Sequence, residues 1–190
     1  SPQLLSTLTA THAQAPSAES VFYYIYAVLY APTYRSNYEE FLRMDFPRIP
    51  FTKDVRLFQE LAALGKKLVD MHLLKSPELD PPACRFNGAG DSRFATSRRD
   101  GLRYDAESQR VYINAAQFFA PVPESVWSYE IGGYHVCEKW LKDRRERRLE
   151  LEDIRTYCHI VTALARTIDL QHAIDAFYPE IERTAIVVPS

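Results

Sequence analysis

The chain has 190 residues, 46% of them hydrophobic, which is enough to bury the core of one large domain or two small ones. Its 23 Lys and Arg residues are outnumbered by 25 Asp and Glu residues, and the net charge of -2 argues against a protein that coats nucleic acid without sequence preference. No apolar run approaches the roughly 20 residues that a membrane helix needs, so we expect no membrane span.

The start of the chain lacks both an initial Met and the charged and apolar regions of a secretory signal. We therefore expect residues 1–20 to be a flexible segment, and the chain to be a piece of a longer cytoplasmic polypeptide. Its three cysteines are an odd number at unrelated spacings, unlike a disulfide framework or a paired CxxC zinc site, and they suit a reducing compartment.

Residues 21–75 are predicted to be helical. The segment ESVFYYIYAVLY has the apolar density of a helix that Ser20 would cap, and Pro32 can open a second helix that runs to Asp45. Residues 46–51 (FPRIPF) cannot be helical, because each proline restricts the residue before it. They are predicted to form a rigid connector.

A long amphipathic helix is predicted after Asp54, whose side chain can cap its N-terminus. Its apolar residues recur at helical spacing and form one nearly uninterrupted stripe, made of Val55, Phe58, Leu61, Ala62, Leu64, Leu68 and Met71.

Residues 76–190 are predicted to combine a β region with C-terminal helices. Three prolines and three glycines make residues 76–101 loop-rich, and LRYDAESQRVYI then alternates around a polar turn as a β-hairpin does. VWSYEI alternates again up to Gly132-Gly133, where the backbone can bend, and Tyr134 is predicted to begin a helix.

A long helix is predicted to close the chain, because apolar residues again follow one another at spacings of three and four: Ile154, Tyr157, Ile160, Val161, Leu164, Ile168 and Phe177. Helices, a short antiparallel β region with a hairpin, and helices again make an α+β fold. Because no βαβ units alternate along the chain, this order argues against a doubly wound nucleotide-binding domain.

Three partial motifs invite an enzymatic interpretation, and each lacks a part that its chemistry needs. Residues 80–83 (DPPA) are similar to the motif with which amino-group DNA methyltransferases hold a flipped base, but Ala83 replaces the aromatic residue and no glycine-rich cofactor loop precedes it. Glu138-Lys139 lacks the intervening residue of a metal-dependent nuclease motif, and no G-x-S-x-G elbow is present. We therefore predict no catalytic residue and no cofactor in this chain.

Zinc binding by His135, Cys137, Cys158 and His159 is a weaker alternative, since thiolate and imidazole are the ligands that zinc prefers. Neither pair has the gap of a zinc knuckle, and neighbouring residues on a helix point about 100° apart. Core or surface roles are favoured for all four.

The basic residues fall into two clusters, within residues 93–103 and within residues 139–148. They fit a solvated helix end, which Lys and Arg stabilise, as well as a surface that contacts DNA. Asn is a residue type that reads adenine edges and Arg one that reads guanine. The candidate DNA-binding set is Asn87, Arg93, Arg98, Arg99, Arg103, Asn114, Lys139, Lys142, Arg144 and Arg145.

Two longer stretches carry a resemblance to a known family. YIYAVLYAPTYRSNYEEFLRMDFPRIPF resembles the passage that follows the methyltransferase core in type ISP restriction-modification enzymes and related single-chain adenine methylases. WSYEIGGYHVCEKWLKDRRER resembles the C-terminal G-G-Y…K-W-L-K-D-R signature of the same family. The similarity runs from about Val21 to Ile174.

The resemblance implies a target-recognition, or specificity, domain at the C-terminus of a large polypeptide that also carries a nuclease, a helicase-like ATPase and an N6-adenine methyltransferase. The implied partners are double-stranded DNA and the methyltransferase domain of the parent chain. An alternative is a docking module that packs on the methyltransferase through its Tyr- and Phe-rich first helices without touching DNA.

Within a DNA-binding interpretation, the two basic clusters have different expected roles. Lys and Arg at the helix end after Gly132-Gly133 can hold phosphates, which fixes register but carries no sequence information. We expect residues 87–103 and the hairpin that follows to supply the base-edge contacts, because a long loop beside a two-stranded ribbon can enter the major groove.

Overall fold

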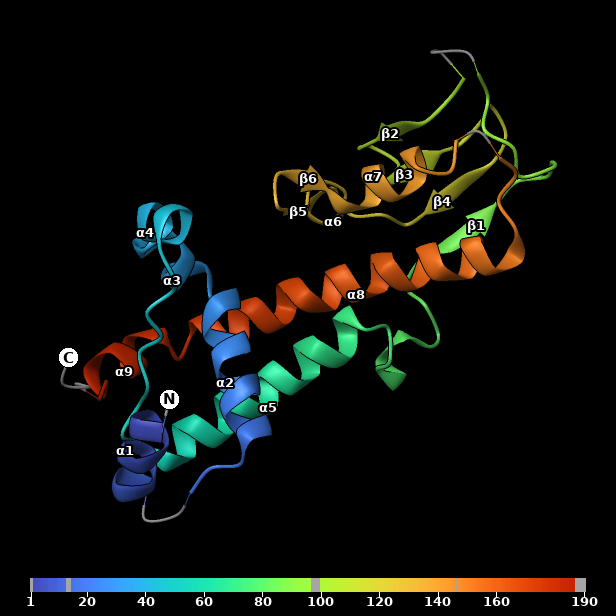
Figure 1. Ribbon diagram of the computed structural model, residues 1–190. Helices are drawn as coiled ribbons and strands as arrows, with labels where there is room; N and C mark the ends of the chain where they lie inside the picture. The colour runs from blue at the N-terminus through green and yellow to red at the C-terminus, as the bar shows by residue number, and fades with distance from the viewer. Residues whose placement is uncertain (1, 13–14, 97–99, 146, 187–190) are drawn as a thin grey trace. The chain divides into compact units, whose positions relative to one another are not determined.

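A computed structural model describes residues 2–12, 15–96, 100–145 and 147–186 of the chain (Figure 1). The chain forms two compact units. The helical unit comprises Ser1–Leu73 and Thr167–Ser190, and the sheet unit comprises Leu74–Arg166. The predicted α+β fold is confirmed, with helices at both ends and a small antiparallel sheet between them.

The helical unit is built from short helices around two long ones. Its elements are α1 (Pro2–His12), α2 (Ala18–Tyr30), α3 (Pro32–Asn37), α4 (Glu39–Met44), α5 (Val55–His72), the last part of α8 (Leu151–Asp175) and α9 (Tyr178–Arg183). Residues 1–20, expected to be a flexible segment, thus contain α1 and the start of α2. Leu8 of α1 is fully buried.

Helix boundaries differ from the predicted ones where a local hydrogen bond decides them. Helix α2 begins at Ala18, because Ser17, and not Ser20, is its N-cap: the Ser17 hydroxyl accepts a hydrogen bond from the Ser20 amide at 3.1 Å. The second predicted helix divides into α3 and α4 at Tyr38, whose backbone leaves the helical region. The non-helical connector and the Asp54 cap of α5 are both confirmed.

The core of the helical unit lies between α2 and α5. The ring of Tyr24 stacks between those of Phe51 and Phe58, at centroid distances of 5.2 and 4.8 Å, and its hydroxyl donates to the carbonyl of Pro50 at 2.7 Å. Gly65 permits the close approach of the two helices, since a Cβ there would lie 1.9 Å from the carbonyl oxygen of Tyr23.

Replacing Gly65 by Ala is expected to destabilise the protein by about 3 kcal/mol, because the added methyl group meets backbone and forces α2 and α5 apart. Lys67→Ala is the control, because Lys67 is exposed and lies two residues after Gly65 on the same helix. Its free energy of unfolding should stay within about 0.5 kcal/mol of that of the parent. Urea unfolding followed by circular dichroism measures both. Equal stability of the Gly65→Ala and Lys67→Ala variants would contradict the packing.

The sheet unit holds a four-stranded antiparallel sheet in the order β1-β4-β3-β2, with a separate two-stranded hairpin. The strands are β1 (Arg85–Asn87), β2 (Arg103–Asp105), β3 (Arg110–Tyr112), β4 (Phe118–Ala120), β5 (Glu130–Ile131) and β6 (Tyr134–His135). The helices of this unit are the 3-10 turn η1 (Pro77–Leu79), α6 (Glu124–Trp127), α7 (Val136–Lys142) and the first part of α8. The predicted hairpin is confirmed as β2–β3.

The predictions around the double glycine need correction. The VWSYEI segment does not form one strand, since its first two residues end α6 and only its last two form β5. Tyr134 lies in strand β6, and the helix begins at Val136. Gly132 and Gly133 have φ values of +60° and +81°, the conformation of a two-residue hairpin turn, so the chain reverses on itself before the helix starts.

One face of the four-stranded sheet is buried by helices. Val111 and Phe119 are fully buried, and the ring of Phe119 lies 4.3 Å from that of Tyr157 on α8. Tyr104 stacks on Trp127 of α6 at 5.1 Å. The side chains that alternate with these must therefore point to the opposite face of the sheet.

Candidate functional site

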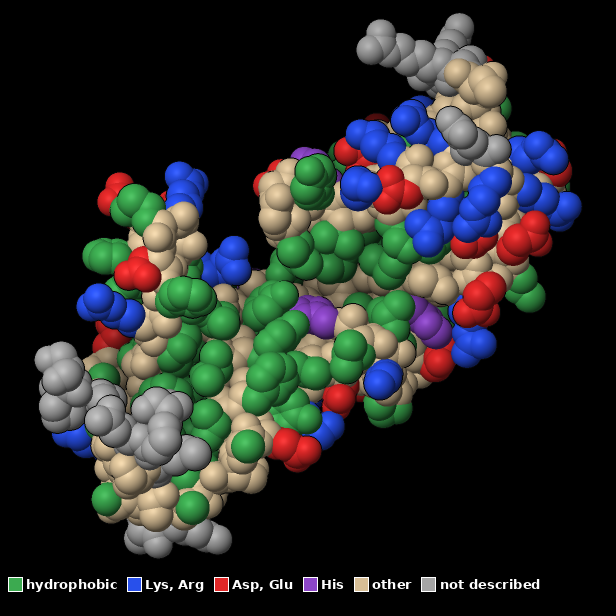
Figure 2. All heavy atoms as spheres, in the orientation of Figure 1, with side chains coloured by type: hydrophobic (Ala, Val, Ile, Leu, Met, Phe, Trp, Pro, Cys, Tyr) green, Lys and Arg blue, Asp and Glu red, His purple; other side chains and the backbone are tan. Residues whose placement is uncertain are grey.

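Basic side chains gather on the sheet unit around α7 and the turn that follows it (Figure 2). On α7, Lys139 pairs with Asp143 and Lys142 pairs with Glu138, each one helical turn away, at 2.6 and 2.7 Å. All four side chains remain partly exposed, and such surface pairs contribute only about 0–1 kcal/mol. Both lysines are therefore available to exchange their carboxylate for a phosphate.

Arg144, the next member of the predicted set, is partly buried and bound within the protein. Its guanidinium lies 3.6 Å from the centre of the Trp140 ring, donates to the carbonyl of Trp140 at 3.0 Å, and reaches Asp153 at 3.3 Å. These three contacts fix the turn after α7 to its own helix and to α8. The geometry favours a positioning role for Arg144 over direct contact with a ligand.

Asp153, in the first turn of α8, is the anchor of this turn. It accepts two hydrogen bonds from the guanidinium of Arg147, at 2.6 and 2.7 Å, and a third from the backbone amide of Glu150 at 3.0 Å. These donors, Arg147 first, lower the pKa of Asp153 to about 2. The carboxylate stays ionised at any physiological pH and holds the turn in place.

An open hollow of about 390 Å³ lies between this turn and the loop after β1, lined by Arg93, Phe94, Ala95, Thr96, Arg145 and Arg147. The two segments are joined through their backbones, by an isolated antiparallel β-bridge between Arg93 and Arg148 and by a hydrogen bond from the Leu149 amide to the Ser92 carbonyl. Within the described residues, no carboxylate pairs with Arg145. Arg147 is bound to Asp153, and Arg93 lies 3.5 Å from Asp91 in an exposed ion pair. Arg145, together with the weakly paired Arg93, makes the hollow suitable for an anion such as a phosphate.

Asn114 and Gln117 lock the loop after β1 onto the sheet. The Asn114 amide donates to the carbonyl of Arg93 and to Gln117, at 2.9 and 3.0 Å, while Gln117 accepts from the Ser92 amide at 2.9 Å. The oxygen of Asn114 also accepts two backbone amides. Both side chains are therefore used to hold the fold together. Asn114 was predicted to contact bases, but its bonds favour a role in positioning the loop after β1.

The remaining predicted residues are placed as follows. Asn87 lies in β1 and donates to the carbonyl of Arg85, and Arg103 lies in β2 with its guanidinium 3.8 Å from the centre of the Tyr112 ring. Arg98 and Arg99 lie outside the described residues. The structure therefore brings Arg93 and Arg145 together around the hollow, and places Asn87 and Arg103 on the sheet.

Arg110, which was not among the predicted DNA-binding residues, lies on the same sheet as Arg103. Its guanidinium is 4.4 Å from the centre of the Phe118 ring and donates to the Tyr112 hydroxyl at 3.3 Å. The alternation of the predicted hairpin contained the signal: Arg103, Arg110 and Tyr112 occupy the positions that alternate with apolar Val111. Phe118 belongs to a strand that was not predicted.

The residues weighed for catalysis and zinc binding have other partners. Asp80 accepts from His159 at 3.0 Å in a segment between η1 and β1, and does not end a strand. Glu138 pairs with Lys142. Cys84, Cys137 and Cys158 are free and buried, and burial raises the pKa of Cys137 to about 12. Among the described residues, no cluster of His, Cys, Asp and Glu is able to hold a metal ion.

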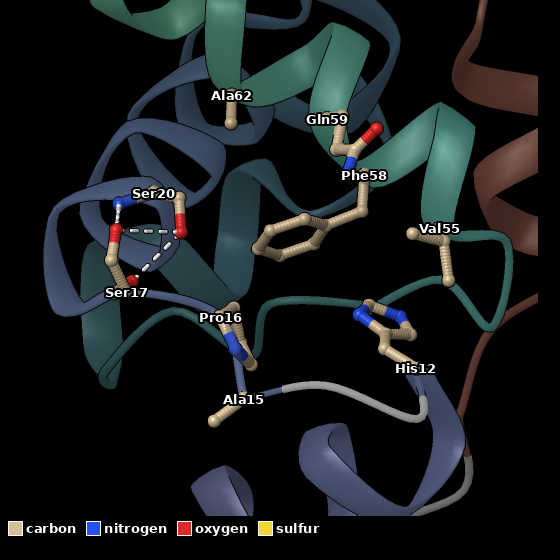
Figure 3. A pocket seen from close by; sticks show the side chains of 9 residues that line it. All are labelled: His12, Ala15, Pro16, Ser17, Ser20, Val55, Phe58, Gln59 and Ala62. Atoms are coloured by element: carbon tan, nitrogen blue, oxygen red, sulfur yellow. Dashed lines mark hydrogen bonds between the residues drawn. The ribbon is translucent and has the colours of Figure 1, made fainter.

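The helical unit has a separate hollow of about 300 Å³ beside His12 and Phe58 (Figure 3). Three of its polar side chains are bonded within the protein: His12 bonds to the carbonyl of Thr52, and Ser17 bonds to Ser20. The arrangement has the character of a packing defect between helices rather than a reaction centre.

None of the described helices combines the length and the apolar character of a membrane-spanning segment.

A family model described as the Type ISP C-terminal specificity domain matches residues 1–172. The chain belongs to this family. No curated protein matches this chain. The family assignment agrees with the resemblance carried by the two sequence stretches described above.

Solved structures share the fold of this specificity domain. A chain of the DrdV–DNA complex matches with a TM-score of 0.70 and 24% identity, covering 92% of this chain and 20% of that chain. A nuclease-deletion mutant of the Type ISP restriction-modification enzyme LlaGI, in complex with a DNA substrate mimic, matches with a TM-score of 0.64 and 19% identity, covering 85% and 16%. The ATP-dependent Type ISP enzyme LlaBIII bound to DNA matches with a TM-score of 0.64 and 18% identity, covering 84% and 11%. The chain thus spans a fifth or less of each of these structures.

Replacing Asp153 by Asn is expected to destabilise the specificity domain by about 2 kcal/mol, because the two guanidinium groups lose their charged acceptor. Asp143→Asn, which removes only the exposed partner of Lys139, is the control and should have little effect.

The pH dependence of stability provides a second test of the contact between Asp153 and the two arginines. The folded-state pKa of Asp153 lies below its unfolded value, so its contribution is present above about pH 4 and is lost as the pH falls through about 2. Thermal melts of parent and variant should therefore converge at the acid end. An unchanged difference between them from pH 7 to pH 2 would contradict the role of Asp153.

Proposed function

We propose that this domain recognises a specific sequence in double-stranded DNA, and thereby directs the adenine methyltransferase and nuclease of a larger restriction-modification polypeptide. The observation that carries the proposal is the arginine-lined hollow beside the sheet of a domain whose family is named for specificity. The DNA-bound state of the DrdV, LlaGI and LlaBIII structures supports it. No catalytic step and no cofactor is assigned to this chain.

In this proposal, phosphate contacts and base contacts come from different parts of the sheet unit. Arg93 and Arg145 at the hollow, with Lys139 and Lys142 on α7, hold the DNA backbone electrostatically and set the register of the domain on the duplex. The net charge of -2 does not oppose this role, since the sheet unit holds 15 Lys and Arg against 14 Asp and Glu, a net of +1, while the helical unit holds 8 against 11, a net of -3. Arg144 acts indirectly, by fixing the turn that carries Arg145.

The charge-reversal pair Arg93→Glu with Arg145→Glu is expected to weaken binding to cognate and non-cognate duplexes by similar factors, at least tenfold at low salt. Loss of two phosphate contacts should also make the dependence of log affinity on log salt shallower by about 2. Fluorescence anisotropy with a labelled duplex at several salt concentrations measures both quantities.

The matched control carries the same charge change on the helical unit, in Arg56→Glu with Lys67→Glu, two exposed residues of α5. This control should keep the affinity of the parent within about twofold. The cognate duplex itself comes from selection of bound sequences out of a random duplex library. If the library yields no enriched sequence, or if the hollow variant binds DNA as the parent does, the proposal is wrong.

A second candidate function is a docking module that packs on the methyltransferase domain without contacting DNA. Three large apolar side chains of the helical unit favour it: Phe41, Met44 and Phe46 are 58, 79 and 89% exposed at and after α4. Such a group of apolar side chains on a soluble surface marks an interaction site. Binding through this surface would depend little on salt, so the salt series above separates the two functions.

A further inference from the structure

The strand pairing defines a second, outward face of the four-stranded sheet. Arg103 pairs with Tyr112, Tyr112 pairs with Phe118, and Phe118 pairs with Asn87, so these four side chains form one row across all four strands. The neighbouring row contains Arg85, Ala120, Arg110 and Asp105. Side chains of both rows alternate with the buried Val111 and Phe119, so they lie on the face opposite Tyr157.

Two arginines on this outward face are backed by aromatic rings. The guanidinium of Arg103 lies 3.8 Å from the centre of the Tyr112 ring, and that of Arg110 lies 4.4 Å from the centre of the Phe118 ring. The rings of Tyr112 and Phe118 are themselves in contact, with centroids 5.2 Å apart. The two cations and two rings form one continuous layer over the middle of the sheet.

The guanidinium of Arg110 is held by two neighbouring residues and still has N–H donors that are not used in hydrogen bonds to the described residues. Besides the Phe118 ring, it contacts the Tyr112 hydroxyl at 3.3 Å, the one hydrogen bond that its side chain makes within the described residues. A guanidinium has five N–H donors in a rigid planar fork. Stacking restrains the plane of the fork before any ligand arrives, which reduces the entropy lost on binding.

The charges of the outward face are not balanced by acids. Arg85, Arg103 and Arg110 face a single carboxylate in these rows, that of Asp105. Asp105 is committed to its own turn, where it accepts from the Ser108 hydroxyl at 2.6 Å, and this bond is the first cause of its lowered pKa. A face with three arginines, two aromatic rings and one committed acid suits a partner that is both anionic and rich in hydrogen-bond acceptors.

We infer that the outward face of the β1–β4 sheet is a base-reading surface, in which Arg110, held by Phe118 and Tyr112, donates to the N7 and O6 acceptors of a guanine in the major groove. The inference rests on the proposed function and adds to it a reading residue outside the basic clusters of the sequence. Arg is the side chain whose fork matches the two guanine acceptors, and the β2–β3 hairpin that carries Arg110 at one edge of the sheet is a two-stranded ribbon of the kind that fits the major groove. Phe118 and Tyr112 are positioning residues.

The direct test combines a conservative variant with a modified base. Arg110→Lys keeps the charge and removes the planar fork, and is compared with the parent on the duplex recovered from the random library. Each guanine of that duplex is then replaced in turn by 7-deazaguanine, which lacks the N7 acceptor. The parent should lose about tenfold in affinity at one guanine. Arg110→Lys should bind the natural duplex about tenfold more weakly and lose nothing further at that same guanine.

Two further variants establish that the effect is one of position and not of folding. Phe118→Leu keeps an apolar side chain and removes the ring behind Arg110, so it should reduce the preference for the selected duplex over a scrambled one while leaving the salt dependence unchanged. Arg56→Lys, on the helical unit, is the matched control and should behave as the parent. Thermal melts of all variants should coincide within a few degrees.

The outcomes separate this inference from the proposed function. If the parent enriches no sequence from the library, both fail. If the parent selects a sequence but Arg110→Lys retains full affinity and the same sensitivity to 7-deazaguanine, the base-reading role of Arg110 is wrong and sequence-specific binding stands. Equal weakening of selected and scrambled duplexes by Arg110→Lys would make Arg110 a phosphate contact, which also overturns the inference.

Discussion

Burial of one face of a small sheet is the constraint on which the sheet unit depends. Phe119 and Val111 are fully buried, and the ring of Phe119 packs on that of Tyr157 of α8, with the ring centroids 4.3 Å apart. Burying a side chain of this size stabilises the fold by about 2 kcal/mol, so a shift of the register by one residue, which would turn both outward, is strongly disfavoured. The same alternation fixes Arg103, Arg110 and Tyr112 on the opposite face. The position of the proposed reading surface therefore follows from the packing of the core.

A second constraint fixes the basic turn beside the sheet. Asp153 binds the guanidinium of Arg147 and reaches Arg144, which in turn stacks on Trp140. Arg145 lies between these two anchored arginines, and the loop that carries Arg93 is held to the sheet by Asn114. Several residues with the chemistry of DNA readers thus serve to place others. This arrangement limits the loss of conformational entropy when a phosphate binds.

Sequence patterns predicted the features that depend on local periodicity or on one strong local signal. The stripe of α5, its Asp54 cap, the proline connector and the β2–β3 hairpin all follow from such signals. Strands β1 and β4 are no shorter than β2 and β3, but no short turn joins them: they pair with each other across about 30 residues of intervening chain, and a local pattern does not reveal such a pairing. Strand β6 was misassigned because the two-residue turn at Gly132-Gly133 pairs residues 134–135 with residues 130–131. Helix α6 was missed because the amides of Val126 and Trp127 donate to the carbonyl of Pro123, which turns the backbone into a helix.

For the candidate site too, the sequence predicts some features, and others depend on contacts that only the folded chain makes. Composition alone indicates which segments are basic, but not which basic side chains have an internal partner. Arg144 and Arg145 are adjacent and chemically identical, yet only Arg144 is bound by Trp140 and Asp153. Asn114 has the chemistry to read adenine, and its amide is used instead by Arg93 and Gln117. Arg110 became a candidate only when the strand register placed it beside Phe118.

In the proposed complex, DNA lies against the outward face of the sheet and the turn after α7. Amide hydrogen exchange of the specificity domain, with and without the duplex recovered from the random library, tests this most directly. Exchange is expected to slow in β3, β4 and the turn after α7, and to stay unchanged in α5, which lies in the other unit. Protection confined to α2, α3 and α4, with the sheet unchanged, would contradict it.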